Sequence, residues 1–200
     1  MASGKQEQGI VVQIAKNFSS LDVDVSRIKK LVKTVCNRFN PCKSAKTVVS
    51  IAIVDDAEMR RVSKKFLGRS STTDCLSFNL SDDRSGAPVR KRPKSQKKHA
   101  LGPKERAAGS SRNAELFELV VNGEMAVKEA KLRGHSSQAE TALYITHGLL
   151  HNLGFVDSTR PQAKKMHDTE DEILQELGYG LVYNKGIRAQ EHKGIRKKTL

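Results

Sequence analysis

The stretch His147-Gly148-Leu149-Leu150-His151-Asn152-Leu153-Gly154-Phe155-Val156-Asp157 is the part of the chain around which the rest is organised. Residues four apart lie on one face of a helix, about 5–6 Å apart at Cβ, so His147 and His151 can direct ring nitrogens at one cation. Gly154 fits the left-handed conformation that commonly ends a helix, which would return Asp157 to the same point. Two histidines, one carboxylate and an open position make the donor set of a catalytic zinc site.

A histidine pair with this spacing can also be two ordinary polar residues on a helix surface. Here the surrounding residues Leu143, Tyr144, Leu150 and Leu153 are apolar, which predicts half-buried imidazoles that would be costly without partners. The residue after the first histidine is Gly148 and not the glutamate base of an H-E-x-x-H metalloprotease. The pattern therefore favours a metal site and disfavours peptide hydrolysis by that route.

Three further groups of residues accompany this stretch. Downstream lie Met166-x-x-x-Glu170-x-Glu172-Ile173-Leu174 and Leu177-Gly178-Tyr179, and upstream lie Thr73-Asp74-Cys75-Leu76-Ser77-Phe78 and Glu118-Leu119-Val120-Val121 with Glu124, Ala126 and Ala130. In this order, over roughly residues 48 to 180 apart from one insertion, they resemble the YbeY family of metal-dependent endoribonucleases. The resemblance implies zinc-dependent cleavage of single-stranded RNA, in maturation of the 3′ end of small-subunit ribosomal RNA and in ribosome quality control.

The chain departs from the family pattern at two positions. The pattern has a histidine as its third metal ligand where this chain has Asp157, and a carboxylate can replace an imidazole on zinc. The pattern also has an active-site arginine at the position of Leu67, and Arg69, two residues on, is the candidate to replace it by neutralising charge on the phosphate. Both departures concern catalysis more than fold.

The positive charge is concentrated in two segments. The formal net charge is +14, of which residues 83–112 carry +8 and residues 184–200 carry +5. Such runs can be solvated extensions or salt-sensitive tethers for a phosphate backbone. A rival interpretation therefore makes the chain a ribosome- or RNA-binding protein that has lost activity, and a third makes it a metallohydrolase on another substrate.

The cysteines and the apolar runs bear on location. The chain has three cysteines, Cys36, Cys42 and Cys75, and no C-x-x-C pair. An odd number without such a pair favours neither a disulfide framework nor a cysteine zinc site. Neither an N-terminal apolar signal region nor a run long enough to span a bilayer is present. We expect a cytoplasmic protein with RNA and the ribosome as partners.

Apolar periodicity predicts one α+β domain over residues 10–183, with a mixed sheet of about four strands and the metal helix packed on it. We expect strands over 10–14, 48–54, 76–79 and 116–121, and helices over 26–39, from 55 to 68, over 124–133 and 137–153, and from 161 to 178. Residues 1–9 are expected to be loose. Residues 81–113, rich in Ser, Gly, Pro, Lys and Arg, are predicted to be a disordered basic insertion, and residues 184–200 a basic tail.

Several side chains have more specific predictions. Ser137 and Glu140 match a capping box at the start of the metal helix. Glu170 and Glu172 could orient a ligand histidine, although a solvated helix face is the simpler expectation. His135 and His167 are expected to be surface histidines, with His167 an alternative metal ligand.

Overall fold

The computed structural model describes residues 9–40, 46–81 and 114–183. The predictions made for residues 1–8, 82–113 and 184–200, and for Cys42, lie outside the described residues.

A four-stranded mixed sheet forms the base of the molecule. Its strands are β1 (Ile10–Lys16), β2 (Lys46–Val54), β3 (Cys75–Asn79) and β4 (Ala114–Asn122), in the order β1-β2-β4-β3. β1, β2 and β4 are parallel, and β3 runs antiparallel to β4. The β-branched residues of β2 suit these pleated, buried strands, and the predicted mixed sheet is confirmed.

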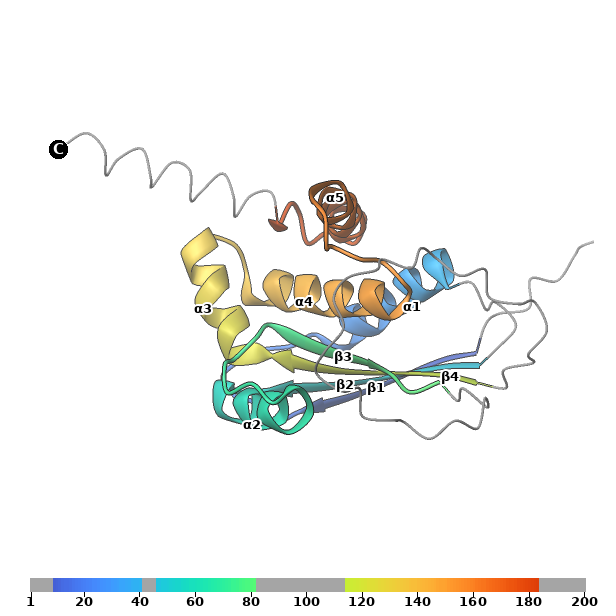
Figure 1. The fold of residues 1–200 in the computed structure, drawn as a ribbon. Coiled ribbons are helices and arrows are strands. Elements are labelled where there is room, and N and C mark those ends of the chain that lie inside the picture. The colour runs from blue at the N-terminus through green and yellow to red at the C-terminus, as the bar shows by residue number, and fades with distance from the viewer. Residues whose placement is uncertain (1–8, 41–45, 82–113, 184–200) are drawn as a thin grey trace, which may run out of the picture.

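Five helices cover the sheet unequally. They are α1 (Val25–Phe39), α2 (Asp56–Leu67), α3 (Gly123–Arg133), α4 (Ser137–Asn152) and α5 (Arg160–Glu176). Figure 1 shows α2 alone on one face, with α1, α3 and α4 on the other and α5 lying on α4 as an outer layer. The single α+β domain that the sequence predicts is confirmed.

The helix that carries the two histidines is the centre of the fold. α4 contacts β3, β4 and the helices α1, α3 and α5. Ile145, Leu149 and Leu150 are fully buried, and burying each such side chain contributes about 1.5–3 kcal/mol relative to exposure. At Gly148 the helix approaches the sheet so closely that a Cβ would lie 2.8 Å from the Cys75 Sγ. A residue without a side chain is therefore required between the two histidines.

The helix ends agree with their local sequences, with one exception. Asp24 and Asp55 accept hydrogen bonds from backbone N–H groups of α1 and α2, and Gly68 ends α2 with a left-handed φ of 68°. The predicted capping box is wrong, because Ser136 caps α4 by accepting from the Ala139 N–H. Glu140 cannot serve in it, since its carboxylate is fully buried against other partners.

Among the described helices, none combines the length and the apolar character needed to cross a lipid bilayer.

Candidate metal centre

His147 and His151 face each other near the C-terminal end of α4. Their Nε2 atoms are 3.1 Å apart, and the ring planes stand nearly perpendicular, at 89°. Both side chains are partly buried, with 23% and 31% exposed. The four-residue spacing thus brings two ring nitrogens to one point, as helix geometry requires.

The partners of the other ring nitrogens fix the tautomers. The Nδ1 of His151 lies 3.1 Å from the Phe155 carbonyl oxygen, and the Nδ1 of His147 lies 2.8 Å from the Glu170 Oε1. A carbonyl oxygen can only accept, and an ionised carboxylate can only accept, so both Nδ1 atoms carry the proton. In the neutral rings, both Nε2 lone pairs then point at each other across 3.1 Å, an arrangement that a cation between them stabilises.

The chain after α4 brings a carboxylate to this point. Gly154 has φ +95°, the Gly154 N–H donates to the His151 carbonyl, and the Phe155 N–H donates to the Leu150 carbonyl. These two bonds form a Schellman motif that reverses the chain. The Phe155 ring then packs edge-on against Phe39 with centroids 5.3 Å apart, which anchors the turn.

Asp157 completes a group of three potential ligand atoms. Its Oδ2 is 3.8 Å from the His151 Nε2, and ligand atoms of His147, His151 and Asp157 all lie within 4.8 Å of one another. Ligand atoms about 2.0–2.1 Å from a tetrahedral zinc ion would be roughly 3.3 Å apart. The separations of 3.1 and 3.8 Å lie on either side of that value, and the whole group lies within 4.8 Å, so small movements of these side chains would let them hold a metal ion of this size.

Glu170 links the histidine pair to α5. Its side chain is 1% exposed and accepts hydrogen bonds from the Nδ1 atoms of His147 and His167, each at 2.8 Å. Burial alone would raise the pKa of Glu170, but the two imidazoles outweigh it, so the pKa lies below its ordinary value. The carboxylate is therefore held ionised as an acceptor.

The charge around His147 favours a cation. Burial opposes protonation of this ring, but the hydrogen bond and charge of Glu170, with the charges of Asp74 and Asp157, outweigh burial and raise the pKa of His147. Negative charge that stabilises an imidazolium also stabilises a metal ion bound at the same nitrogen. The site is thus electrostatically suited to a cation.

Three of the sequence predictions about neighbouring side chains are wrong. Glu170 is buried where a solvated position was expected, whereas Glu172 is exposed and pairs with Arg38 as expected for a helix surface. His167 is partly buried, with its ring stacked on Tyr183 at 3.5 Å between centroids, and lies outside the group of possible ligands. His135 is 6% exposed and binds the buried carboxylate of Glu140.

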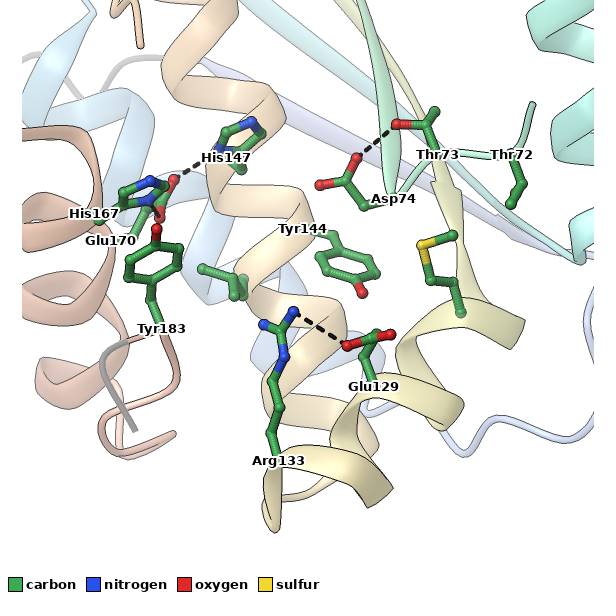
Figure 2. Close-up of a pocket in the computed structure, with 12 residues that line it drawn as sticks. Thr72, Thr73, Asp74, Glu129, Arg133, Tyr144, His147, His167, Glu170 and Tyr183 are labelled. Carbon is green, nitrogen blue, oxygen red and sulfur yellow. Dashed lines mark hydrogen bonds and ion pairs between the residues drawn. The ribbon is translucent and has the colours of Figure 1, made fainter. Parts of the chain in front are cut away.

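A cavity of about 430 Å³ adjoins His147. Its walls come from the loop before β3 and from α3, α4, α5 and the segment after α5, as Figure 2 shows. The lining residues are Thr72, Thr73, Asp74, Met125, Glu129, Arg133, Leu143, Tyr144, His147, His167, Glu170 and Tyr183. His147 therefore belongs both to the possible ligand group and to the cavity wall.

The arginine in this wall is Arg133, which no sequence pattern indicated. Arg69 is exposed in the loop after α2 and is absent from the cavity lining. Leu67 is 51% exposed at the end of α2. The role of Arg69 in neutralising charge on the phosphate stays a prediction. The sequence offers no motif that marks Arg133 as a cavity residue, beyond its place at the end of α3.

Asp74 faces the cavity across from His147 (Figure 2). Its Oδ1 accepts from the Thr73 hydroxyl at 2.9 Å and from the Cys75 N–H at 2.8 Å. These bonds fix the carboxylate, and Figure 2 shows its other oxygen turned into the cavity. Asp74 therefore places a carboxylate in the same cavity as His147, and this carboxylate does not belong to the group of possible metal ligands.

Comparison with known proteins points to one family. The family model "Endoribonuclease YbeY" matches residues 13–178. A protein of Thermoanaerobacter sp. (strain X514) named Endoribonuclease YbeY is 27% identical over 155 residues, covering 76% of this chain and 87% of that protein. One of the same name from Carboxydothermus hydrogenoformans is 26% identical over 168 residues, covering 84% and 98%.

A solution structure of a Thermotoga maritima protein aligns over 83% of this chain and 91% of its own, with a TM-score of 0.48 and 17% identity. The family model covers most of the chain. It includes the five helices and the four strands described above, except for the first three residues of β1. The chain therefore belongs to the YbeY endoribonuclease family.

Proposed function

We propose that this protein is a zinc-dependent endoribonuclease that cuts single-stranded RNA in ribosomal RNA processing and ribosome quality control. Membership of the family supports hydrolysis of RNA. The observation that carries metal dependence is the pair of Nε2 atoms facing each other at 3.1 Å while both Nδ1 atoms have acceptors. We place the activity in the cytoplasm, which suits the ribosome as partner and an odd number of cysteines.

His147, His151 and Asp157 would hold the zinc ion. The replacement of a histidine by Asp157 keeps three protein donors of types that zinc accepts, and leaves a position open. Zinc in such a site supplies polarisation of a phosphoryl oxygen and a water of lowered pKa. A set of only three protein donors also argues against a purely structural ion, because structural sites use four protein ligands.

The residues of the chain supply positioning and proton transfer. Glu170 and the Phe155 carbonyl hold the two imidazoles in the tautomer that leaves Nε2 for the metal. Asp74 is the carboxylate placed to accept the proton of the attacking water, because it is fixed at one oxygen and turned toward His147 at the other. Sequence alone suggested no general base.

The rival function is RNA binding without cleavage through the basic segments 83–112 and 184–200. These segments lie outside the described residues. The two functions differ in how they respond to loss of zinc. RNA binding by basic residues would survive the loss of zinc and would weaken as the salt concentration rises, whereas cleavage would be lost with the zinc.

The test compares zinc-loaded wild-type protein with His151→Ala on a labelled single-stranded RNA. His151 is 31% exposed, so the variant should remain folded, as circular dichroism would show, while losing zinc and cleavage. Glu172→Gln, on the exposed face of α5, is the matched control and should cut normally. Retained cleavage by folded His151→Ala would refute the proposal, and a duplex and a panel of phosphodiesters and amides would reveal another substrate.

A further inference from the structure

The cavity beside His147 is large enough for more than a phosphate. Its volume of about 430 Å³ lies within the range of about 300–1,000 Å³ found for small-molecule sites. The His147 ring forms part of its wall. Because His147 is also one of the proposed metal ligands, a group covalently attached to a phosphate bound at that ligand can reach into this cavity.

The charge of the lining favours a neutral group over a second phosphate. Asp74, Glu129 and Glu170 contribute three carboxylates to the wall against the one guanidinium of Arg133, so the wall would repel an anion more than attract it. The same carboxylates accept hydrogen bonds from N–H groups. The cavity is thus suited to an uncharged ligand that presents N–H donors, as a nucleobase does.

The wall opposite His147 combines one donor group with one acceptor group. The Nη2 of Arg133 lies 3.2 Å from the Glu129 Oε2, one helical turn away on α3, and its Nη1 lies 3.1 Å from the Glu140 Oε1. A guanidinium has five N–H donors, so these two ion pairs leave donors for a ligand. These donors are the remaining N–H groups of Nη1 and Nη2, because the Nε of Arg133, although it has no hydrogen-bond partner among the described residues, is buried from solvent.

Aromatic rings supply flat apolar surface between these polar ends. Tyr144 and Tyr183 both line the cavity, and Figure 2 shows them between His147 and Arg133. The Tyr183 ring is held by stacking on His167, with planes within 10°. Proteins that bind single-stranded RNA commonly stack unpaired bases on such rings.

We propose that the cavity is a binding site for an unpaired guanine of the nucleotide next to the scissile phosphate, with Arg133 and Glu129 reading the base. Guanine offers O6 and N7 as acceptors, the pair that arginine binds most often. It also offers N–H donors that suit the Glu129 carboxylate. This assignment rests on the proposed function, and it accounts for single-strand specificity because a base within a duplex cannot enter the cavity.

The experiment measures binding of mononucleotides, which contain no phosphodiester to cleave. Zinc-loaded full-length protein is titrated with GMP, AMP, CMP and UMP by calorimetry. The phosphate is common to all four, so differences in Kd report the base. We expect GMP to bind at least tenfold more tightly than each of the others.

Glu129→Gln is the decisive variant, because the Glu129 side chain is 31% exposed and forms an ion pair with Arg133 in the same wall. It should remove most of the preference for GMP while keeping the zinc content. Arg133→Lys should weaken GMP binding tenfold or more. This variant also loses the ion pair with buried Glu140, which lowers the stability of the fold. Glu118→Gln, exposed on β4, is the control and should bind as the wild type does.

Equal Kd values for the four nucleotides, or a GMP preference that survives in Glu129→Gln, would overturn the assignment. The outcome is separable from that of the proposed function. If the protein cleaves RNA but binds the four mononucleotides equally, the guanine site alone is refuted. If it prefers GMP but does not cleave RNA, the guanine site stands and the nuclease function is refuted.

Discussion

Replacing Glu170 by glutamine tests how the protein tunes its metal ligands. The carboxylate is 1% exposed and accepts from the Nδ1 atoms of His147 and His167, each at 2.8 Å. Glutamine keeps the volume but removes the charge, and its NH₂ group can only donate. One of the two imidazoles then loses its acceptor or must change tautomer.

The magnitude follows from the role of this bond. Changing the partner of a metal-ligating histidine typically weakens metal affinity about 10–100-fold, which corresponds to about 1.4–2.8 kcal/mol. We therefore expect Glu170→Gln to raise the Kd for zinc by that factor. The pKa of His147 in metal-free protein should fall, because the hydrogen bond and charge of Glu170 are the largest of the contributions that oppose the effect of burial.

The assay is competition for zinc against a chromophoric chelator at pH 7.5, with nuclear magnetic resonance titration of the His147 ring in metal-free protein. Glu172→Gln is the control, since that side chain is 60% exposed and pairs with Arg38. Its zinc affinity should match the wild type. A Kd for Glu170→Gln within twofold of wild type, or an equal loss in both variants, would refute the reasoning.

Three further predictions concern other parts of the fold. Asp74→Asn should lower RNA cleavage about 10²–10⁴-fold by removing a proton acceptor, and single-turnover kinetics at saturating zinc would measure this without a contribution from weaker zinc binding. Gly148→Ala should lower the free energy of unfolding by about 1–3 kcal/mol through overpacking against Cys75, despite the better helix propensity of alanine; a urea melt that shows stabilisation would contradict it. The pKa of Asp56 is lowered, chiefly by a hydrogen bond from Lys128, so Asp56 stabilises the fold at neutral pH and loses this effect as pH falls below about 4. The stability difference between wild type and Asp56→Asn should accordingly shrink in acid, and denaturant titrations at pH 7 and 3 would measure it.

Local signals gave most of the secondary structure. Asp24, Asp55 and Gly68 mark helix ends through side-chain acceptors and a left-handed turn, which are properties of the residues themselves. The four-residue spacing of His147 and His151 likewise gives proximity without any tertiary information. These features could be predicted because each depends on contacts within about one helical turn.

Tertiary contacts explain the errors. Glu140 fits a capping box by sequence, but its neighbours in space, His135 and Arg133, make it a buried ionic centre. Glu170 has the sequence context of a solvated helix face and becomes buried only because α5 packs on α4 at His147. The inclusion of Arg133 in the cavity also depends on how α3 meets α4, which no local pattern encodes.

The most direct test of the metal centre is zinc per chain, measured by elemental analysis of untagged protein for the wild type and for Asp157→Ala. The account predicts close to one zinc ion per wild-type chain and a marked loss in the variant, since Asp157 supplies the third ligand atom of the group. Little zinc in folded wild-type protein that has been offered the metal, or equal zinc in both proteins, would contradict the assignment of His147, His151 and Asp157 as the ligands.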